Sequence, residues 1–322
     1  MIKFKLIKRS LCLLLAMTAV FLTSCSGALN KDDGIKILCT IYPQYDWVKN
    51  IVGDVESVTV DLLVENGADV HSYQPSVDDI IRIKQSDAVI LVGGESDGWV
   101  FEAIAGAQNE AITLLELDGV NLYGLSDEYV ASEHEHEHEH EHHHSDVIDE
   151  HVWLSVKNAI SSCNAICDWL CAADPDNSAV YRANTDKYIR SLEELNEKFE
   201  GLDASGSEQI IFADRFPFVY LFEDYGVSYL AAFEGCSTDS EADFETVRRL
   251  AERLGQTRAE YIAVSESSDK RLASSVMSAA GVECEIVVFD SLQSVTVRQI
   301  EGGYSYIGAM ESNFEALAKI LK

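Results

Sequence analysis

Short apolar runs rich in β-branched residues alternate with helical stretches along most of this chain, and this alternation restricts its fold more than any other feature. The expected strands are Ile35 to Ile41, Ser57 to Val64, Ala88 to Val92, Gln209 to Ala213, Tyr261 to Ser265 and Glu285 to Phe289. Strands that are separated by helices pair in parallel, and the helices cover both faces of the sheet. The sequence therefore predicts an α/β fold built from parallel sheets.

The helical stretches between these strands are marked by their apolar spacing and, in one case, by a cap. They are Tyr45 to Val52, Phe244 to Leu254, Lys270 to Ala280, and a helix capped by Ser76 that runs through Ile83. Serine at the first position accepts a hydrogen bond from a backbone N–H that has no partner in the helix. The pattern thus repeats in both halves of the chain, which predicts two lobes.

A long helical segment from Pro175 to Phe199 separates the two halves. Its apolar residues fall on one face of a helix at Tyr181, Tyr188, Leu192, Leu195 and Phe199. About 25 residues at a rise of 1.5 Å make a rod of roughly 37 Å, with Pro175 suited to its first turn. We predict an N-terminal lobe over residues 34–173, a single rigid linking helix over 174–200 and a C-terminal lobe over 201–322.

The first 24 residues have the organisation of a bacterial export signal. Four basic residues precede an apolar stretch from Leu11 to Leu22, which is shorter than the about 20 residues that a membrane-spanning helix needs. The segment that ends in Cys25 resembles a lipobox, and an ordinary secretory signal with a chance cysteine is the alternative. We expect Cys25 to carry a lipid and residues 25–33 to tether the protein to the outer face of the cytoplasmic membrane.

The charge of the chain excludes one class of partner. The formal net charge is −31, and it becomes −35 without residues 1–24, which hold four Lys or Arg and no acidic residue. A field of this sign repels the phosphates of nucleic acid, so nucleic acid is excluded as a partner. The same field attracts cations, although it does not select among them.

Seven of the nine histidines lie in one short segment, residues 133–144, where Glu and His alternate. They are His134, His136, His138, His140, His142, His143 and His144. The segment has no apolar residue to bury, so we expect a solvated loop whose imidazole and carboxylate groups contact divalent metal ions. Because a loose loop loses chain entropy when several ligands converge on one ion, it should bind metal weakly. A merely solvated acidic loop is the alternative.

Four residues elsewhere have positions that suit a metal site. His71 follows the expected strand that ends at Val64, His151 follows the His-rich segment, and Asp214 and Asp290 each follow a strand directly. Ligands of open parallel sheets bind beyond the carboxyl ends of the strands. Each residue alone has an ordinary explanation, such as a surface histidine or a helix-capping aspartate. Together they predict a site for Zn²⁺, Mn²⁺ or Fe²⁺ between the lobes.

Three cysteines recur at every fourth residue within an apolar segment: Cys163, Cys167 and Cys171. This spacing places them on one face of a helix. Because the chain has no CxxC pair there, we expect buried small side chains rather than a thiolate metal site.

Several segments resemble the metal-binding lipoproteins that are the solute-binding components of ABC uptake transporters. Gly67 to Pro75 resembles the GADPHxYEP segment of that family, and Asp149 to Leu154 resembles its DPHVWL segment. Thr40 to Asp46 is similar to its first strand and turn, and Phe289 to Leu292 is similar to its C-terminal segment, so the resemblance covers the mature chain. Zinc-type members also carry a His-rich loop before the second histidine segment. The resemblance implies two α/β lobes, one long linking helix and a metal cleft between the lobes.

Carried over by position, the resemblance implies metal ligands His71 and His151 from the N-terminal lobe and Asp290 from the C-terminal lobe. The departure is the third ligand, because family members have His or Glu where this chain has Arg215. Arginine cannot ligate a cation. We expect either that Asp214 substitutes for it or that three protein ligands bind the metal together with water.

Glu234 and Glu266 are weaker candidates for the missing ligand. A site of histidines and carboxylates also suits Mn²⁺ or Fe²⁺, whereas the His-rich loop favours zinc.

The resemblance implies an exported, lipid-anchored solute-binding protein that captures Zn²⁺ and delivers it to an ABC permease. We expect a monomer that is not an enzyme. The same role for Mn²⁺ or Fe²⁺ is the first alternative. A secreted metallohydrolase is disfavoured because no general base is obvious beside a metal with an open position. The pattern HExxH occurs within the alternating Glu and His segment, as at His134 to His138, and G-x-S-x-G occurs at Gly94 to Gly98. A surface adhesin-like lipoprotein with an incidental metal site is the remaining alternative.

Overall fold

The computed structural model describes residues 34–65, 67–124, 148–205, 207–235 and 242–322. The predicted export signal, the tether with Cys25 and the His-rich segment 133–144 lie outside the described residues. Within those ranges, no helix combines the length and the apolar character needed to cross a membrane.

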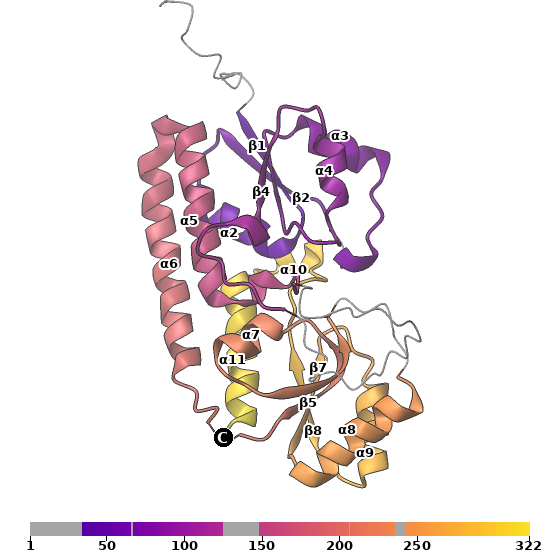
Figure 1. Ribbon diagram of the computed structural model, residues 1–322. Coiled ribbons are helices and arrows are strands. Elements are labelled where there is room, and N and C mark those ends of the chain that lie inside the picture. Colours follow the sequence, from indigo (N-terminus) through magenta and orange to yellow (C-terminus); the bar gives the residue numbers. More distant parts are fainter. Residues whose placement is uncertain (1–33, 66, 125–147, 206, 236–241) are drawn as a thin grey trace, which may run out of the picture.

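Two four-stranded parallel sheets form the framework of the protein (Figure 1). The first contains β1 (Ile35–Cys39), β2 (Val58–Leu62), β3 (Ala88–Leu91) and β4 (Glu110–Thr113), in the order β2-β1-β3-β4. The second contains β5 (Ile210–Phe216), β6 (Tyr229–Glu234), β7 (Tyr261–Ser265) and β8 (Glu285–Phe289), in the order β6-β5-β7-β8. All neighbouring pairs are parallel. The predicted fold class, two parallel-sheet α/β lobes, is confirmed.

Helices connect and cover these strands. In the first half they are α2 (Tyr42–Val52), α3 (Val77–Gln85), α4 (Trp99–Ile104) and α5 (Val156–Ala173). After α6 (Ser178–Glu200), the second half has α7 (Val219–Asp224), α8 (Phe244–Thr257), α9 (Arg271–Ala280), α10 (Val297–Glu301) and α11 (Tyr306–Ile320). The 3-10 turns are η2 (Val70–Ser72), η3 (Leu114–Glu116), η6 (Val152–Leu154) and η7 (Pro175–Asn177). Ser76 caps α3 as predicted, since its side chain accepts a hydrogen bond from Asp79 N.

Helix α6 follows one side of the molecule, beside α5 (Figure 1). It packs against α5 and α2 from the first half and against α11 from the second. The predicted apolar stripe of this helix is buried. Pro175 does not open the long helix, because Pro175–Asn177 forms the separate turn η7 and α6 begins at Ser178.

The end of β5 differs from the prediction in a way that matters for the site. The apolar run ends at Ala213, yet the strand continues to Phe216 because Arg215 and Phe216 still pair with β6. A register shift between Phe212 and Arg215 interrupts the ladder. Asp214 therefore lies within the strand rather than directly after it.

One buried apolar cluster extends through both halves and includes Trp47, Trp153 and Phe289. Trp153 also joins the halves by polar contacts, because its Nε1 donates to Ser291 O and its carbonyl accepts from the Tyr306 hydroxyl. Both bonds are buried. The segment that follows His151 is thus held between the two lobes.

Candidate metal centre

His151 is fully buried, and its ring orientation is set by a buried carboxylate. Asp149 Oδ1 accepts hydrogen bonds from the backbone N–H of His151 at 2.8 Å and from its ring Nδ1 at 3.0 Å. A carboxylate oxygen accepts, so Nδ1 carries a proton and Nε2 is the ring atom that can offer a lone pair to a metal ion. This is the arrangement of a metal-binding histidine supported by a carboxylate.

His71 lies in the turn η2, and its ring approaches Nε2 of His151. Asp69 caps this turn by accepting from His71 N, and Ser96 Oγ lies 2.6 Å from His71 Nδ1. The Nε2 atoms of His71 and His151 are 3.0 Å apart. Two nitrogen ligands of tetrahedral zinc, with bonds of about 2.0–2.1 Å, are separated by about 3.3 Å. The pair therefore has nearly the spacing of two zinc ligands, and this much of the predicted site is brought together.

The pKa of His71 is lowered to about 4, mainly because burial disfavours the charged ring and next because His151 is close. Asp69 and Glu150 act in the opposite direction. His71 is consequently neutral near pH 7, which is the state that binds metal.

The turn that carries Ser96 is held by two buried carboxylates that sequence reasoning did not single out. The Glu150 carboxylate accepts from the backbone N–H groups of Glu95 and Ser96. Asp97 accepts from the N–H groups of Val92 and Gly93. In the sequence, only the place of Glu150 beside His151 indicated that it belongs to the site.

Gly94 has a steric reason to be glycine, because a Cβ there would lie 2.3 Å from Glu150 Cδ. The turn from β3 and the segment before η6 therefore fit together closely, and they place Ser96 against His71.

The second half of the chain lies directly against both rings. The side-chain amide of Gln293 is 3.2 Å from His71 Nε2. A Cβ on Gly235 would lie 2.6 Å from His151 Cε1. Gly67, four residues before His71, donates its N–H to Val295 O. The two halves are thus in contact around the histidine pair.

Arg215 does not face an open ligand position. Its Nη1 lies 3.1 Å from Asp69 Oδ2, so it forms an ion pair between the second half and the turn that holds His71. Because both side chains are partly exposed, the pair contributes little stability by itself, about 0–1 kcal/mol. Its positive charge also disfavours protonation of His71.

Asp214 and Asp290, the two predicted carboxylate ligands, have other partners in this structure. Asp214 accepts from the Ser265 hydroxyl at 2.6 Å and from Arg215 N. Asp290 accepts from the Tyr304 hydroxyl at 2.7 Å and from Leu292 N.

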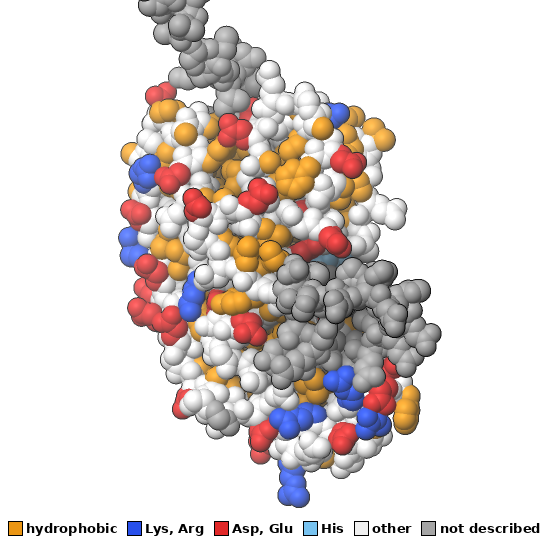
Figure 2. Space-filling model, in the orientation of Figure 1, with side chains coloured by type: hydrophobic (Ala, Val, Ile, Leu, Met, Phe, Trp, Pro, Cys, Tyr) orange, Lys and Arg blue, Asp and Glu red, His pale blue; other side chains and the backbone are white. Residues whose placement is uncertain are grey.

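No group of three or more His, Cys, Asp or Glu side chains within the described ranges could hold a metal ion. The four-residue coordination sphere is therefore not assembled here. Glu266, a weaker candidate, accepts hydrogen bonds from the backbone and hydroxyl of Ser291. The face in Figure 2 has scattered acidic side chains, and among its coloured residues a small area of histidine surface shows beside the grey region.

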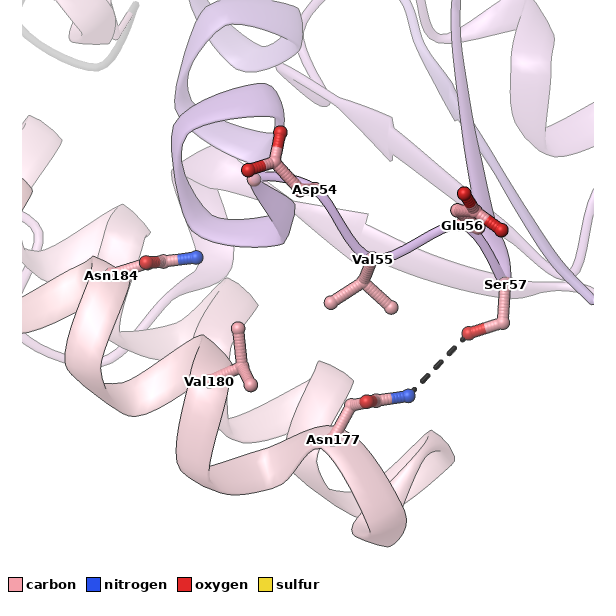
Figure 3. A pocket seen from close by; sticks show the side chains of 8 residues that line it. Asp54, Val55, Glu56, Ser57, Asn177, Val180 and Asn184 are labelled. Atoms are coloured by element: carbon pink, nitrogen blue, oxygen red, sulfur yellow. Dashed lines mark hydrogen bonds between the residues drawn. The ribbon is translucent and has the colours of Figure 1, made fainter.

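An open cavity of about 550 Å³ lies elsewhere, between the turn after α2 and the start of α6 (Figure 3). It is lined by Gly53, Asp54, Val55, Glu56, Ser57, Asn177, Val180 and Asn184. Asn177 contacts Ser57 across it. Because the lining has no His or Cys, we assign the transition-metal chemistry to the histidine pair instead.

Comparison with known proteins identifies similar chains. A family model described as zinc-uptake complex component A, periplasmic, matches residues 37–320. The chain is 29% identical over 306 residues to the zinc-binding lipoprotein AdcA of Streptococcus pneumoniae, covering 95% of this chain and 59% of that protein. It is 28% identical over 307 residues to the high-affinity zinc uptake system protein ZnuA of Bacillus subtilis, covering 95% of this chain and 93% of that protein.

Among solved structures, the Zn(II)-bound ZnuA-like domain of Streptococcus pneumoniae AdcA matches with a TM-score of 0.69 and 26% identity. The match covers 89% of this chain and 99% of that domain. The chain thus spans 59% of the length of this AdcA relative and nearly all of its ZnuA-like domain.

Proposed function

Because this chain belongs to the family of periplasmic zinc-uptake complex component A, we propose that it is a solute-binding protein that captures Zn²⁺ for an ABC permease. The observation that supports this most is the pair of imidazoles whose Nε2 atoms are 3.0 Å apart. The Zn(II)-bound relative, similar over 89% of the chain, supports zinc as the cargo. The alternative cargo is Mn²⁺ or Fe²⁺.

The chemistry of capture follows from the state of the two rings. Both imidazole rings are held at Nδ1, His151 by Asp149 and His71 by Ser96. The rings therefore have their orientation before the ion binds, and binding costs little side-chain entropy. Burial keeps His71 neutral, so little proton competition is expected at this ring near pH 7. We propose Asp290 and Asp214 as further ligands, which requires each to leave its hydroxyl partner.

The location and the collecting loop are also part of the proposal. Cys25 would anchor the mature protein by a lipid outside the cytoplasmic membrane, as the name lipoprotein of the AdcA relative supports. Residues 133–144 would collect ions weakly and raise their concentration near the histidine pair. The expected monomer, with the lobe boundaries at 173 and 200, completes the proposal.

The first experiment is a calorimetric titration of zinc into unlipidated mature protein. Three variants are compared with the wild type: His71→Ala, His151→Ala and a deletion of residues 133–144. We expect one tight site that survives the deletion and is lost in both histidine variants. Competition by Mn²⁺ and Fe²⁺ in the same titration separates the alternative cargoes. If all binding disappears with the loop, the histidine pair is not the primary site.

A further inference from the structure

His71 Nε2 has two close neighbours, and only one of them is a histidine. His151 Nε2 lies at 3.0 Å, and the side-chain amide of Gln293 lies at 3.2 Å. Gln293 is partly buried in the segment between β8 and α10. The segment is anchored on both sides, because Ser291 N donates to Glu266 and Thr296 N donates to Gln299. Gln293 therefore reaches the site from a well-supported backbone.

Counting protons shows which end of the Gln293 amide faces His71. His151 Nδ1 donates to Asp149, which leaves Nε2 as the ring atom that takes the acceptor role in the tautomer that binds metal. At 3.0 Å, His71 must therefore donate from Nε2, and its Nδ1 accepts from the Ser96 hydroxyl.

An amide NH₂ group cannot bond to an Nε2 that already carries a proton. The structure places the amide nitrogen of Gln293 nearest to His71 Nε2. Because the oxygen and nitrogen of an amide exchange places when the group is turned by 180°, we assign the oxygen to this position as the acceptor.

We propose that Gln293 is a metal ligand, and that its amide oxygen completes a three-donor face with Nε2 of His71 and of His151. This inference rests on the proposed capture of zinc. The Gln293 amide nitrogen lies 3.2 Å from His71 Nε2, and the amide oxygen takes this place when the amide group turns by 180°. This separation is close to the about 3.3 Å between two ligands of tetrahedral zinc. The fourth position is left for water or for a carboxylate.

The proton balance of the step includes water. Zinc takes the lone pairs of both Nε2 atoms and of the amide oxygen. His71 Nε2 releases its proton to water and His71 Nδ1 takes up one proton from water, so the ring stays neutral. Nδ1 then donates to Ser96 Oγ, 2.6 Å away, whose own hydroxyl proton turns away from the ring. His151 keeps its proton on Nδ1 against Asp149 throughout.

Gln293 also has an advantage over the two predicted carboxylates. Asp214 and Asp290 each accept two hydrogen bonds from other groups, whereas the Gln293 side chain is directed at His71.

The test compares Gln293→Ala and Gln293→Glu with the wild type, and it uses Gln299→Ala as a control on the same segment. Thr296 is the N-cap of α10, and the Gln299 side chain accepts a hydrogen bond from its hydroxyl. The loss of Gln299 therefore perturbs the segment without removing a proposed metal ligand. We expect Gln293→Ala to weaken zinc binding by about tenfold to a hundredfold, as the loss of a group at a metal site does. Gln293→Glu should tighten it, and Gln299→Ala should bind as the wild type does.

X-ray absorption of the zinc-loaded protein supplies a second measurement that a purely structural role would not change. In Gln293→Ala, the amide oxygen should be missing from the zinc coordination or be replaced by water, and either change should alter the spectrum. The melting temperature of the metal-free variant should equal that of the metal-free wild type. Wild-type affinity and an unchanged spectrum in Gln293→Ala would overturn the ligand role alone. A wild type that binds no zinc would overturn the proposed function itself.

Discussion

At the scale of single residues, the groups bonded to Nδ1 decide what the two histidines can do. Asp149 is fully buried and holds His151 by both backbone and ring. Ser96 performs the corresponding task for His71 with a neutral hydroxyl. The hydrogen bond between His151 and the carboxylate of Asp149 is thus stronger than the one between His71 and the neutral hydroxyl of Ser96.

Replacing Asp149 by Asn should lower zinc affinity by about tenfold to a hundredfold. The neutral amide no longer raises the basicity of His151, and it does not force the proton onto Nδ1. Competition with a chromophoric chelator measures the change. Asp168→Asn is the matched control, because Asp168 is an exposed acid on α5 paired with Arg182. Equal zinc affinity in the two variants would contradict the role assigned to Asp149.

The metal-free protein should lose stability as the pH falls from about 6.5 towards about 4. The pKa of His71 is lowered in the folded state, so the unfolded chain binds more protons at this position within that window. The contribution of His71 is therefore present above the ordinary pKa and is lost as the pH falls. Thermal melting of wild type and His71→Asn across this range measures it. Parallel pH curves for the two proteins would exclude this contribution.

At the scale of elements, three helices from different parts of the chain meet at Asp46. The Tyr188 hydroxyl of α6 donates to Asp46 Oδ2 at 2.9 Å, and Asn50 of α2 donates to the same oxygen. Tyr306 at the start of α11 contributes its backbone N–H. Burial raises the pKa of Asp46, while the hydrogen bonds from Tyr188, Tyr42 and the Tyr306 backbone act against that increase.

Replacing Tyr188 by Phe should lower the free energy of unfolding by about 1–2 kcal/mol, because a buried carboxyl loses one of its donors. Urea denaturation of the metal-free protein gives the value. Tyr181→Phe serves as the comparison on the same helix. Its partner Asp174 keeps a hydrogen bond from Asn177, so we expect a smaller loss. A larger loss in Tyr181→Phe would contradict this account of α6.

Local sequence signals predicted these elements to different degrees. The strands at Tyr261–Ser265 and Glu285–Phe289 have the predicted bounds, because compact apolar runs mark them. Cys163 and Cys167 of α5 are buried as predicted, whereas Cys171 is partly exposed. Strand β5 exceeds its apolar run, because Arg215 and Phe216 pair with β6 beyond the register shift. Such pairing depends on a partner strand that local patterns do not include.

At the scale of the whole molecule, contact between the two halves defines the surroundings of the site. Gly235 lies so close to His151 that a Cβ would also come within 2.8 Å of Pro217 Cα. This position has no room for a side chain.

Gly235→Ala should therefore destabilise the protein by about 1–3 kcal/mol and weaken zinc binding, because overpacking displaces His151. Gly255→Ala in α8 is the control, since the nearest atom to its added Cβ is 3.9 Å away. Alanine there should stabilise the helix by up to about 1 kcal/mol. Chemical denaturation and zinc titration of both variants provide the comparison. Unchanged zinc affinity in Gly235→Ala would argue against tight contact at His151.

The sequence by itself predicted many of the elements, although not β4 or β6, and it singled out the two histidines. Strand runs, helix spacing and the cap at Ser76 could be predicted because they depend only on neighbouring residues. It also determined the segments that place the chain in its family. The tertiary structure alone decided which groups meet at Nε2 of His71, since Gln293 is 222 residues away in the chain. It likewise decided that Arg215 pairs with Asp69 and that Asp290 bonds to Tyr304. The physical reason is that contacts between the halves depend on how two sheets pack together, and no local pattern encodes that packing.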